Sequence, residues 1–222
     1  MDITVVGAHR FAATPERAKL SLSAGFESDA KEEAMRMTTS LVTDLHAELQ
    51  ALKAIKPSPI TWFAVLPIRT RSWRPYHDKG KILPMRYGAV AALSVKFRDF
   101  KALVQLAGEL GGRPGVTLNG VAWTLTEVTK AKVEAKVLAD AVKRARERAL
   151  VIAKAAGATS IVAVEIADPG LLRGDLVSTA ESGYHAAVTR DSTAGGGSED
   201  IQLVPEDIEV SATVHARFQT AG

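Results

Sequence analysis

Alternation of polar and apolar residues predicts β-strands along most of the chain. In Ala18–Phe26 (AKLSLSAGF) and Ile208–Phe218 (IEVSATVHARF), every second residue is apolar, as in a strand with one buried face. Pro67 interrupts a third predicted strand, which indicates an edge position or a bulge. An almost wholly apolar run, SIVAVEIA, predicts a buried strand. The less regular predicted strands, this run included, span residues 2–7, 60–71, 87–97, 116–127 and 160–167.

Apolar residues that recur at intervals of three and four predict three helices. The first follows Ser28, whose hydroxyl suits an N-cap, and extends to about Ile55. A short second helix spans Arg98–Leu110, and a long third one spans Lys130–Ala156 before Gly157. The apolar stripe of the third helix consists mainly of alanine, which allows close packing against whatever the helix covers. Its members are Leu138, Ala141, Ala145, Ala149, Ile152 and Ala156.

The mixture of helices and hairpins predicts an α+β fold. In chain order the elements read β-β-α-β-β-α-β-α-β-loop-β, which favours largely antiparallel sheets covered by two long helices and one short helix. With 222 residues the chain can bury a substantial core, as one domain or as two small lobes. Glycines break all periodicity between residues 169 and 198, so we expect a flexible, exposed loop there.

The amino-acid composition limits the kinds of functional site that the chain can form. Apolar residues make up 46% of the chain and charged residues 24%, as in ordinary globular proteins. The chain has no cysteine, which excludes disulfides, thiolate metal sites and cysteine nucleophiles. The formal net charge is only +3, so any binding of nucleic acid has to depend on local clusters of cations.

The N-terminal residues lack the pattern of a signal peptide. His9 and Arg10 interrupt the apolar run of Val5 and Val6, and no apolar run approaches the roughly 20 residues that a membrane-spanning helix needs. We therefore expect a cytoplasmic protein without a membrane span, or a periplasmic or secreted one if a leader was removed.

No sequence motif points to catalysis or to a cofactor. The five histidines (His9, His46, His77, His185 and His215) do not have the spacing of metal ligands. There is no nucleophile elbow of the G-x-S-x-G type, and no glycine-rich loop is followed by Lys-Ser/Thr. A Ser-His-Asp triad can still assemble from distant segments. We expect a protein without enzymatic activity, metal or cofactor.

The segment from Arg69 to Arg86 is the strongest candidate for binding a partner. It combines six cations with one acid, Asp78, and places two aromatic rings among them. Cations attract phosphates, and aromatic rings stack on unpaired bases. A solvated hairpin loop, or a contact with a neighbouring subunit, would have the same composition. The candidate residues are Arg69, Arg71, Trp73, Arg74, Tyr76, Lys79, Lys81 and Arg86.

Several segments, in their order along the chain, resemble proteins of the SIMPL domain family, many of which are bacterial. They are ITVVGAHRFAATPERAKLSLS, YGAVAALSVKFRDF, GVAWTLTE, the alanine-rich helix before Gly157, and VPEDIEVSATVHARF. The resemblance implies an α/β fold and, from a periplasmic immunogenic member, self-assembly into a large ring. It supplies no catalytic residues. In two respects the chain departs from the family: it lacks the usual signal peptide, and Pro205-Glu206 replaces a common Pro-Gly pair.

Three hypotheses about function follow. The preferred one is a non-enzymatic module that self-associates and binds protein partners. A second is a protein associated with nucleic acid through residues 69–86. A third is a small-ligand binder or an enzyme whose site gathers His, Asp or Glu, and Ser from distant segments.

Overall fold

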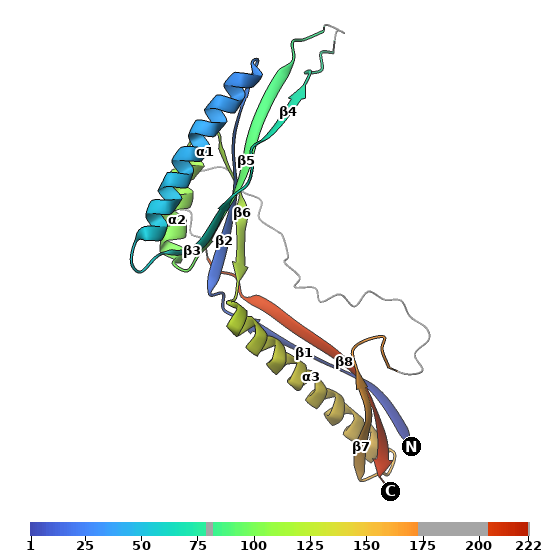
Figure 1. The fold of residues 1–222 in the computed structure, drawn as a ribbon. Coiled ribbons are helices and arrows are strands. Elements are labelled where there is room, and N and C mark those ends of the chain that lie inside the picture. The colour runs from blue at the N-terminus through green and yellow to red at the C-terminus, as the bar shows by residue number, and fades with distance from the viewer. Residues whose placement is uncertain (79–81, 173–203, 222) are drawn as a thin grey trace. The chain divides into compact units, whose positions relative to one another are not determined.

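The computed structural model describes residues 1–78, 82–172 and 204–221. These residues form eight strands in two antiparallel sheets and three helices (Figure 1), so the predicted α+β class is confirmed. The described chain divides into two compact units. Unit 1 comprises residues 1–14, 125–172 and 207–221, and unit 2 comprises residues 15–124, without 79–81, and 204–206. Most of the predicted loop 169–198, from residue 173 onward, lies outside the described residues.

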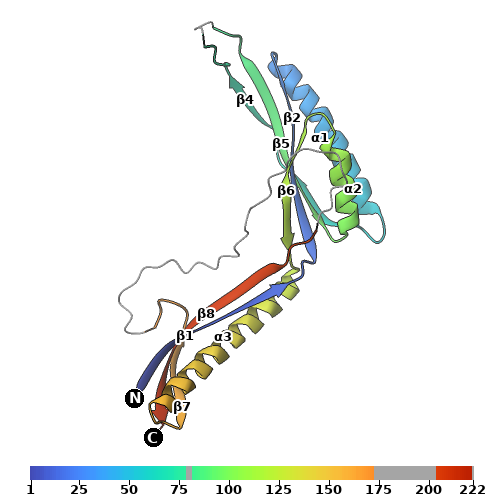
Figure 2. The ribbon, with the colours of Figure 1, turned by 180° about the vertical axis from the view of Figure 1, so that it is seen from behind.

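Unit 2 is a sheet with two helices on one face (Figures 1 and 2). Its strands lie in the order β3-β5-β2-β6, with β4 also paired to β5, and every pairing is antiparallel. The chain order β2-α1-β3-β4-β5-α2-β6 on this sheet is the split β-α-β arrangement of ferredoxin-like folds. The elements are β2 (Arg17–Ser28), α1 (Lys31–Ala54), β3 (Ile60–Val65), β4 (Arg69–Trp73), β5 (Arg86–Phe97), α2 (Phe100–Gly111) and β6 (Val116–Thr124).

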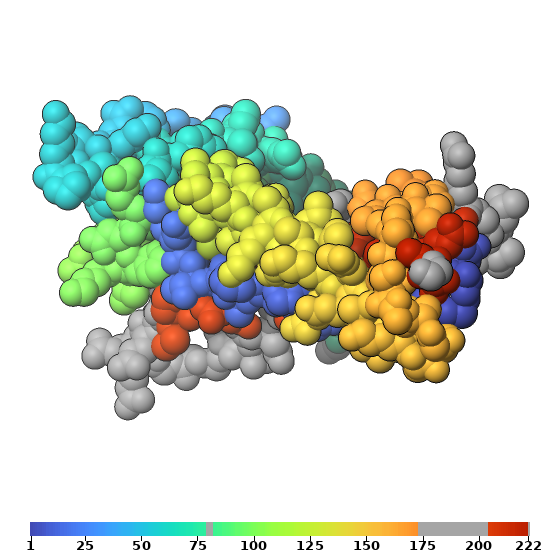
Figure 3. Space-filling model, turned by 90° about the horizontal axis from the view of Figure 1, so that it is seen from below, coloured from blue at the N-terminus to red at the C-terminus, as the bar shows by residue number. Residues whose placement is uncertain are grey.

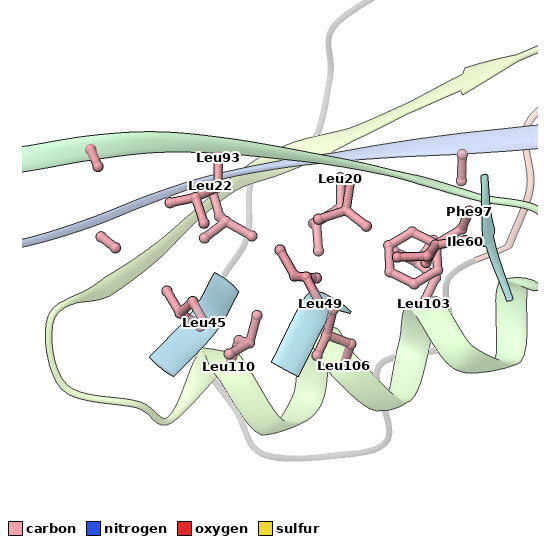
Figure 4. Packing of buried hydrophobic residues seen from close by; sticks show 14 of the residues in the cluster. Leu20, Leu22, Leu45, Leu49, Ile60, Leu93, Phe97, Leu103, Leu106 and Leu110 are labelled. Atoms are coloured by element: carbon pink, nitrogen blue, oxygen red, sulfur yellow. The ribbon is translucent and has the colours of Figure 1, made fainter. Parts of the chain in front are cut away.

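Leucines from both helices and the sheet form the core of unit 2. In Figure 4, the side chains of Leu45 and Leu49 on α1 and of Leu103 on α2 point toward the sheet. The polar side chain of Thr38 is also buried: it accepts a hydrogen bond from the backbone N–H of Phe26 and donates one to the carbonyl of Ala89, both at 3.1 Å. The alternation that predicted β2 is confirmed, because Ala18, Leu20, Leu22 and Ala24 are all buried.

The predicted start of the first helix is wrong by two residues. Helix α1 begins at Lys31, and its N-cap residue is Ala30, whose side chain makes no capping bond. The hydroxyl of Ser28 instead accepts a hydrogen bond from the N–H of Ala30 at 3.3 Å and donates one to Glu33 at 2.7 Å. Ser28 is still paired in β2, so its backbone cannot also open the helix.

Strand pairing also divides the predicted strand 60–71. Strand β3 ends at Val65 and β4 begins at Arg69, with Pro67 between them, and both pair with β5. Because proline has no N–H to donate to the ladder, the strand is interrupted there. Both pieces lie at the edge of the sheet, as Pro67 predicted.

Unit 1 is a three-stranded sheet, ordered β1-β8-β7, on which α3 lies. At Gly7, helix and strand approach so closely that an added Cβ would lie 2.7 Å from the Cβ of Ala145. The alanine-rich helix therefore packs closely on the sheet, as its composition predicted. The elements are β1 (Asp2–Ala13), α3 (Glu127–Ala155), β7 (Ser160–Ala167) and β8 (Ile208–Ala221).

The predicted buried stripe of α3 is only partly correct. The buried residues follow one another at intervals of four: Val137, Ala141, Ala145, Ala149 and Ala153. Leu138 and Ile152 are 40% and 41% exposed, and Ala156 is the C-cap residue. Side chains as large as those of Leu138 and Ile152 at the centre of the contact would hold α3 away from the sheet. Because α3 approaches the sheet closely at Gly7, these two residues lie at the border of the contact.

The prediction that strand 160–167 is buried is wrong. In β7, Val162 and Val164 are each 57% exposed, because β7 is an edge strand and α3 packs mainly on β1 and β8. The space-filling view shows α3 (yellow) and β7 (orange) at the molecular surface (Figure 3). Among the residues of both units that the structure describes, no helix is long and apolar enough to cross a membrane.

Candidate functional site

The structure distributes the basic segment 69–86 over two paired strands. Arg69, Arg71 and Trp73 belong to β4, and Trp73 lies opposite Arg86 of β5. The guanidinium of Arg71 lies 4.5 Å from the centre of the Trp73 ring, and its Nη2 lies 2.7 Å from a carboxylate oxygen of Glu27. Three of the predicted cations, Arg69, Arg71 and Arg86, thus belong to a hydrogen-bonded strand pair in place of a solvated loop.

Acidic side chains already neutralise part of this segment. Arg71 pairs with Glu27, and Arg86 pairs with Asp29 at 2.6 Å. Arg69 has no ionic partner among the described residues. Beyond the strand, Arg74 and Tyr76 are exposed, Tyr76 by 90%. Lys79 and Lys81 lie outside the described residues.

The register of the sheet places more cations on the same face as Arg69. Residues directly opposite each other in paired strands project to the same face. Lys19 of β2 is opposite Lys96 of β5, and Trp62 of β3 is opposite Lys96 on the other side. The neighbouring residues along these strands are buried against the helices: Ala18, Leu20, Val95 and Phe97. The row of Lys19, Lys96 and Trp62 therefore faces away from the helices.

We call this surface of unit 2 the open face. Toward one end it carries Lys19, Lys96 and Trp62, a residue that is 46% exposed. Toward the other end it carries the basic residues of β4 and Arg86. Apart from the exposed Val90, small residues separate the two ends: Ser21, Ser23, Gly25 and Gly120, with Ala64, Ala92 and Ser94. Sequence reasoning missed Lys19, Lys96 and Trp62, because only strand register brings them together.

Unit 1 carries the other feature relevant to binding, an unpaired strand edge. Strand β1 pairs with β8 over all of its 12 residues, and no described strand pairs with its other edge. Thr4, Val6, Ala8 and Arg10 alternate with buried or half-buried residues and project away from α3. Val6 is 44% exposed at the middle of this row.

Two open, largely polar hollows lie in the described surface. One is lined by His9, Asp140, Lys143, Arg144 and Glu147, and in it the Nε2 of His9 lies 3.7 Å from a carboxylate oxygen of Asp140. The other is lined by Glu48, Glu109, Leu110, Gly112 and Arg113. Neither has a serine, threonine or cysteine in its lining. Within residues 1–78, 82–172 and 204–221, no three His, Asp or Glu side chains are grouped as metal ligands.

Comparison with known proteins identifies the family. No curated protein matches the chain. The family model for SIMPL, described as a protein of unknown function (DUF541), matches residues 3–218. The match includes every helix of both units and extends from β1 into β8, so it covers far more than half of the chain. The chain therefore belongs to the SIMPL family.

Proposed function

We propose that this protein is a non-enzymatic module that self-associates through the edge of β1 and serves in assembly or in binding protein partners. The observation that carries the proposal is the length and regularity of that edge. A strand edge presents unpaired N–H and C=O groups, which are a template for pairing with another chain. Natural proteins usually interrupt such edges with bulges, prolines or charges.

The other edges in the described structure have such interruptions. The register of β7 shifts between Ala163 and Glu165, and that of β3 shifts between Ile60 and Trp62. In β6, Asn119 is the extra residue between Leu118 and Gly120, which pair with consecutive residues of β2. Strand β4 is short, with 5 residues, and follows Pro67 closely. Strand β1, by contrast, keeps its register from Asp2 to Ala13 and contains no proline.

The outward residues of β1 are complementary to a second copy of themselves. Two copies paired antiparallel about Val6 would place Val6 opposite its counterpart and Thr4 opposite Ala8. The same register places Asp2 opposite Arg10, twice by symmetry, and such opposite-charge pairs contribute roughly 0.2–1 kcal/mol each. An interface that uses the same patch on both subunits is the arrangement of closed two-fold dimers.

The test is the native mass of the purified protein and of two lysine variants. We expect the wild type to exceed the monomer mass at micromolar concentration in sedimentation velocity or mass photometry. Val6→Lys places two like charges at the proposed two-fold axis and should yield monomers. Val162→Lys makes the same change on an exposed residue of the bulged edge β7, so it should keep the wild-type mass. A monomeric wild type contradicts self-association, and dissociation by Val162→Lys alone would place the contact at β7.

A further inference from the structure

The open face of unit 2 contains a pair of like charges that the fold does not compensate. Lys19 and Lys96 lie directly opposite each other on the two central strands, where Cβ atoms are about 4.5–5.5 Å apart. Like charges in this position destabilise a sheet. Among the residues that the structure describes, no carboxylate forms an ion pair with either lysine. The pair therefore lowers stability, and an anion bound between the two ammonium groups would remove the repulsion.

The next row of the sheet supplies uncharged hydrogen-bond donors beside this pair. Ser21 lies opposite Ser94, one step along the same face, and both side chains are half-buried. A serine hydroxyl donates one hydrogen bond and fits a phosphate oxygen. Two ammonium groups and two hydroxyls thus occupy adjacent rows on two neighbouring strands.

The charge of the whole face is strongly positive. Register places six cations on it, of which Arg71 pairs with Glu27 and Arg86 with Asp29, so four cations have no ionic partner among the described residues. The small residues between its two ends let an extended chain lie close to the backbone. Strand β5 has 12 residues, so the face is about 40 Å long at roughly 3.3 Å per residue. The six cations are Arg17, Lys19, Arg69, Arg71, Arg86 and Lys96.

An exposed indole distinguishes nucleic acid from an acidic polypeptide as the ligand. Trp62 is adjacent to Lys96 across the strands, and the residue is nearly half exposed. Unpaired bases stack on such rings beside cations that hold the phosphates. A duplex offers no unstacked base, and an acidic peptide makes little use of the ring. We propose that the open face of unit 2 binds single-stranded nucleic acid, with Lys19 and Lys96 as the central phosphate contacts and Trp62 as a stacking platform.

The affinity arises mainly from charge and has little dependence on base sequence. Sheet platforms that read RNA bases carry aromatic rings on central strands. Here the central strands carry Ser21, Ser23, Ala92 and Ser94 on this face, and the tryptophans belong to the edge strands. The site therefore has one free ring, since the ring of Trp73 already stacks with Arg71.

The experiment measures binding of a fluorescent 15-nucleotide oligo-dT to the full chain by anisotropy, from about 50 to 300 mM salt. We expect binding at low salt that weakens steeply as salt rises. The double variant Lys19→Gln/Lys96→Gln should bind about tenfold more weakly or worse. Its slope of log K against log salt should be smaller by about 1.4, since each single-strand phosphate contact contributes about 0.7. Trp62→Ala should weaken binding about tenfold without changing the slope.

The matched control removes two charges elsewhere. Lys132 and Lys154 are exposed on α3 and have no ionic partner in the described part of the chain, so Lys132→Gln/Lys154→Gln should bind as the wild type does. The Lys19/Lys96 variant should also unfold at the wild-type midpoint or above it, because it loses a repulsion. A lower midpoint would identify the lysine pair as structural and overturn the proposal.

Competitors separate nucleic acid from other anions. Oligo-dT should be displaced by unlabelled single strands but not by polyglutamate of equal charge or by millimolar phosphate. No binding at 50 mM salt, or equal weakening in the α3 control, would overturn the proposal. Polyglutamate that competes as well as the single strand would assign the face to an acidic polypeptide, and tighter binding of a duplex would exclude the stacking role of Trp62.

Discussion

Two glycines show that packing decides which residues a position accepts. An added Cβ on Gly7 would meet the backbone of Ala141 and Ala145 on α3, whereas one on Gly108 of α2 would meet nothing within 4 Å. We predict that Gly7→Ala lowers the free energy of unfolding of unit 1 by about 1–3 kcal/mol, because the helix has to move outward. Gly108→Ala should raise that of unit 2 by about 0.5–1 kcal/mol, because glycine weakens a helix interior.

Two probes can follow these effects separately. All three tryptophans of the chain, Trp62, Trp73 and Trp123, belong to unit 2, so their fluorescence reports Gly108→Ala in urea unfolding. Amide exchange of the β1 and β8 backbone reports Gly7→Ala. A Gly7→Ala protein with unchanged exchange would show that α3 is not packed as closely as the structure has it.

The buried hydroxyl of Thr38 leads to a second prediction at the scale of single residues. It satisfies the N–H of Phe26 and the carbonyl of Ala89, which connects α1 to β2 and β5. Thr38→Val keeps the shape but leaves both backbone groups without this partner, so we expect a loss of about 1–3 kcal/mol in urea unfolding followed by tryptophan fluorescence. Thr39→Val is the matched control, because the Thr39 hydroxyl is exposed and bonds only within its own helix. An equal loss in both variants would contradict this role.

The N-termini of α1 and α2 differ in whether a side chain caps them. Asp99 caps α2 by accepting hydrogen bonds from the N–H groups of Lys101 and Ala102, at 2.9 and 3.4 Å. Ala30 occupies the same position on α1, with an extended backbone but no side-chain acceptor. We predict that Asp99→Ala lowers the free energy of unfolding by about 1 kcal/mol and that Ala30→Ser raises it by a similar amount. If Ala30→Ser does not raise the free energy of unfolding, the hydroxyl of Ser28 already acts as the acceptor at this end of α1.

Local sequence patterns correctly predicted whether most segments form helices or strands. They did not predict which parts of the protein cover those elements. Alternation in AKLSLSAGF predicted β2 and its buried residues, since that signal depends only on neighbours along the chain. The exposure of Val162 could not be predicted in this way, because the same apolar run fits a central or an edge strand. The phase of the α3 stripe depended on Gly7, more than a hundred residues away, whose lack of a Cβ admits only alanine-sized neighbours.

The residues of the candidate binding surface also differ in whether the sequence alone reveals them. The basic residues Arg69 and Arg71 could be found from the sequence, because they are close together along the chain. Lys19 and Lys96 are 77 positions apart by their numbers, and only the β2–β5 register makes them neighbours. Antiparallel register depends on contacts across the whole unit, which a single sequence does not reveal.

At the scale of the whole molecule, self-association should depend on the charges at both ends of the paired part of β1. In the proposed register, Asp2 lies opposite Arg10 of the second copy. We predict that Asp2→Arg alone yields monomers, because it places two cations opposite each other. The exchange Asp2→Arg/Arg10→Asp should restore the wild-type mass in sedimentation velocity. Monomers in the double variant would contradict this register.

The chain order suggests that unit 2 is an insertion that can fold alone. Residues 15–124 form all of its strands and helices and its core, between β1 and α3 of unit 1. We predict that a fragment of residues 15–124 unfolds cooperatively in urea, with the tryptophan emission of the full chain. It should bind oligo-dT as the full chain does, because it keeps Lys19, Lys96 and Trp62, and it should be monomeric, because it lacks β1.

Leu103→Ala provides the control for this fragment. Leu103 is fully buried between α2 and the sheet, so its truncation should lower the free energy of unfolding by about 2–5 kcal/mol in the fragment and in the full chain alike. If the fragment lacks a cooperative transition while the full chain has one, unit 2 depends on unit 1 for its stability. If it unfolds cooperatively but remains oligomeric, the contact between copies lies outside β1, because β1 is absent from it.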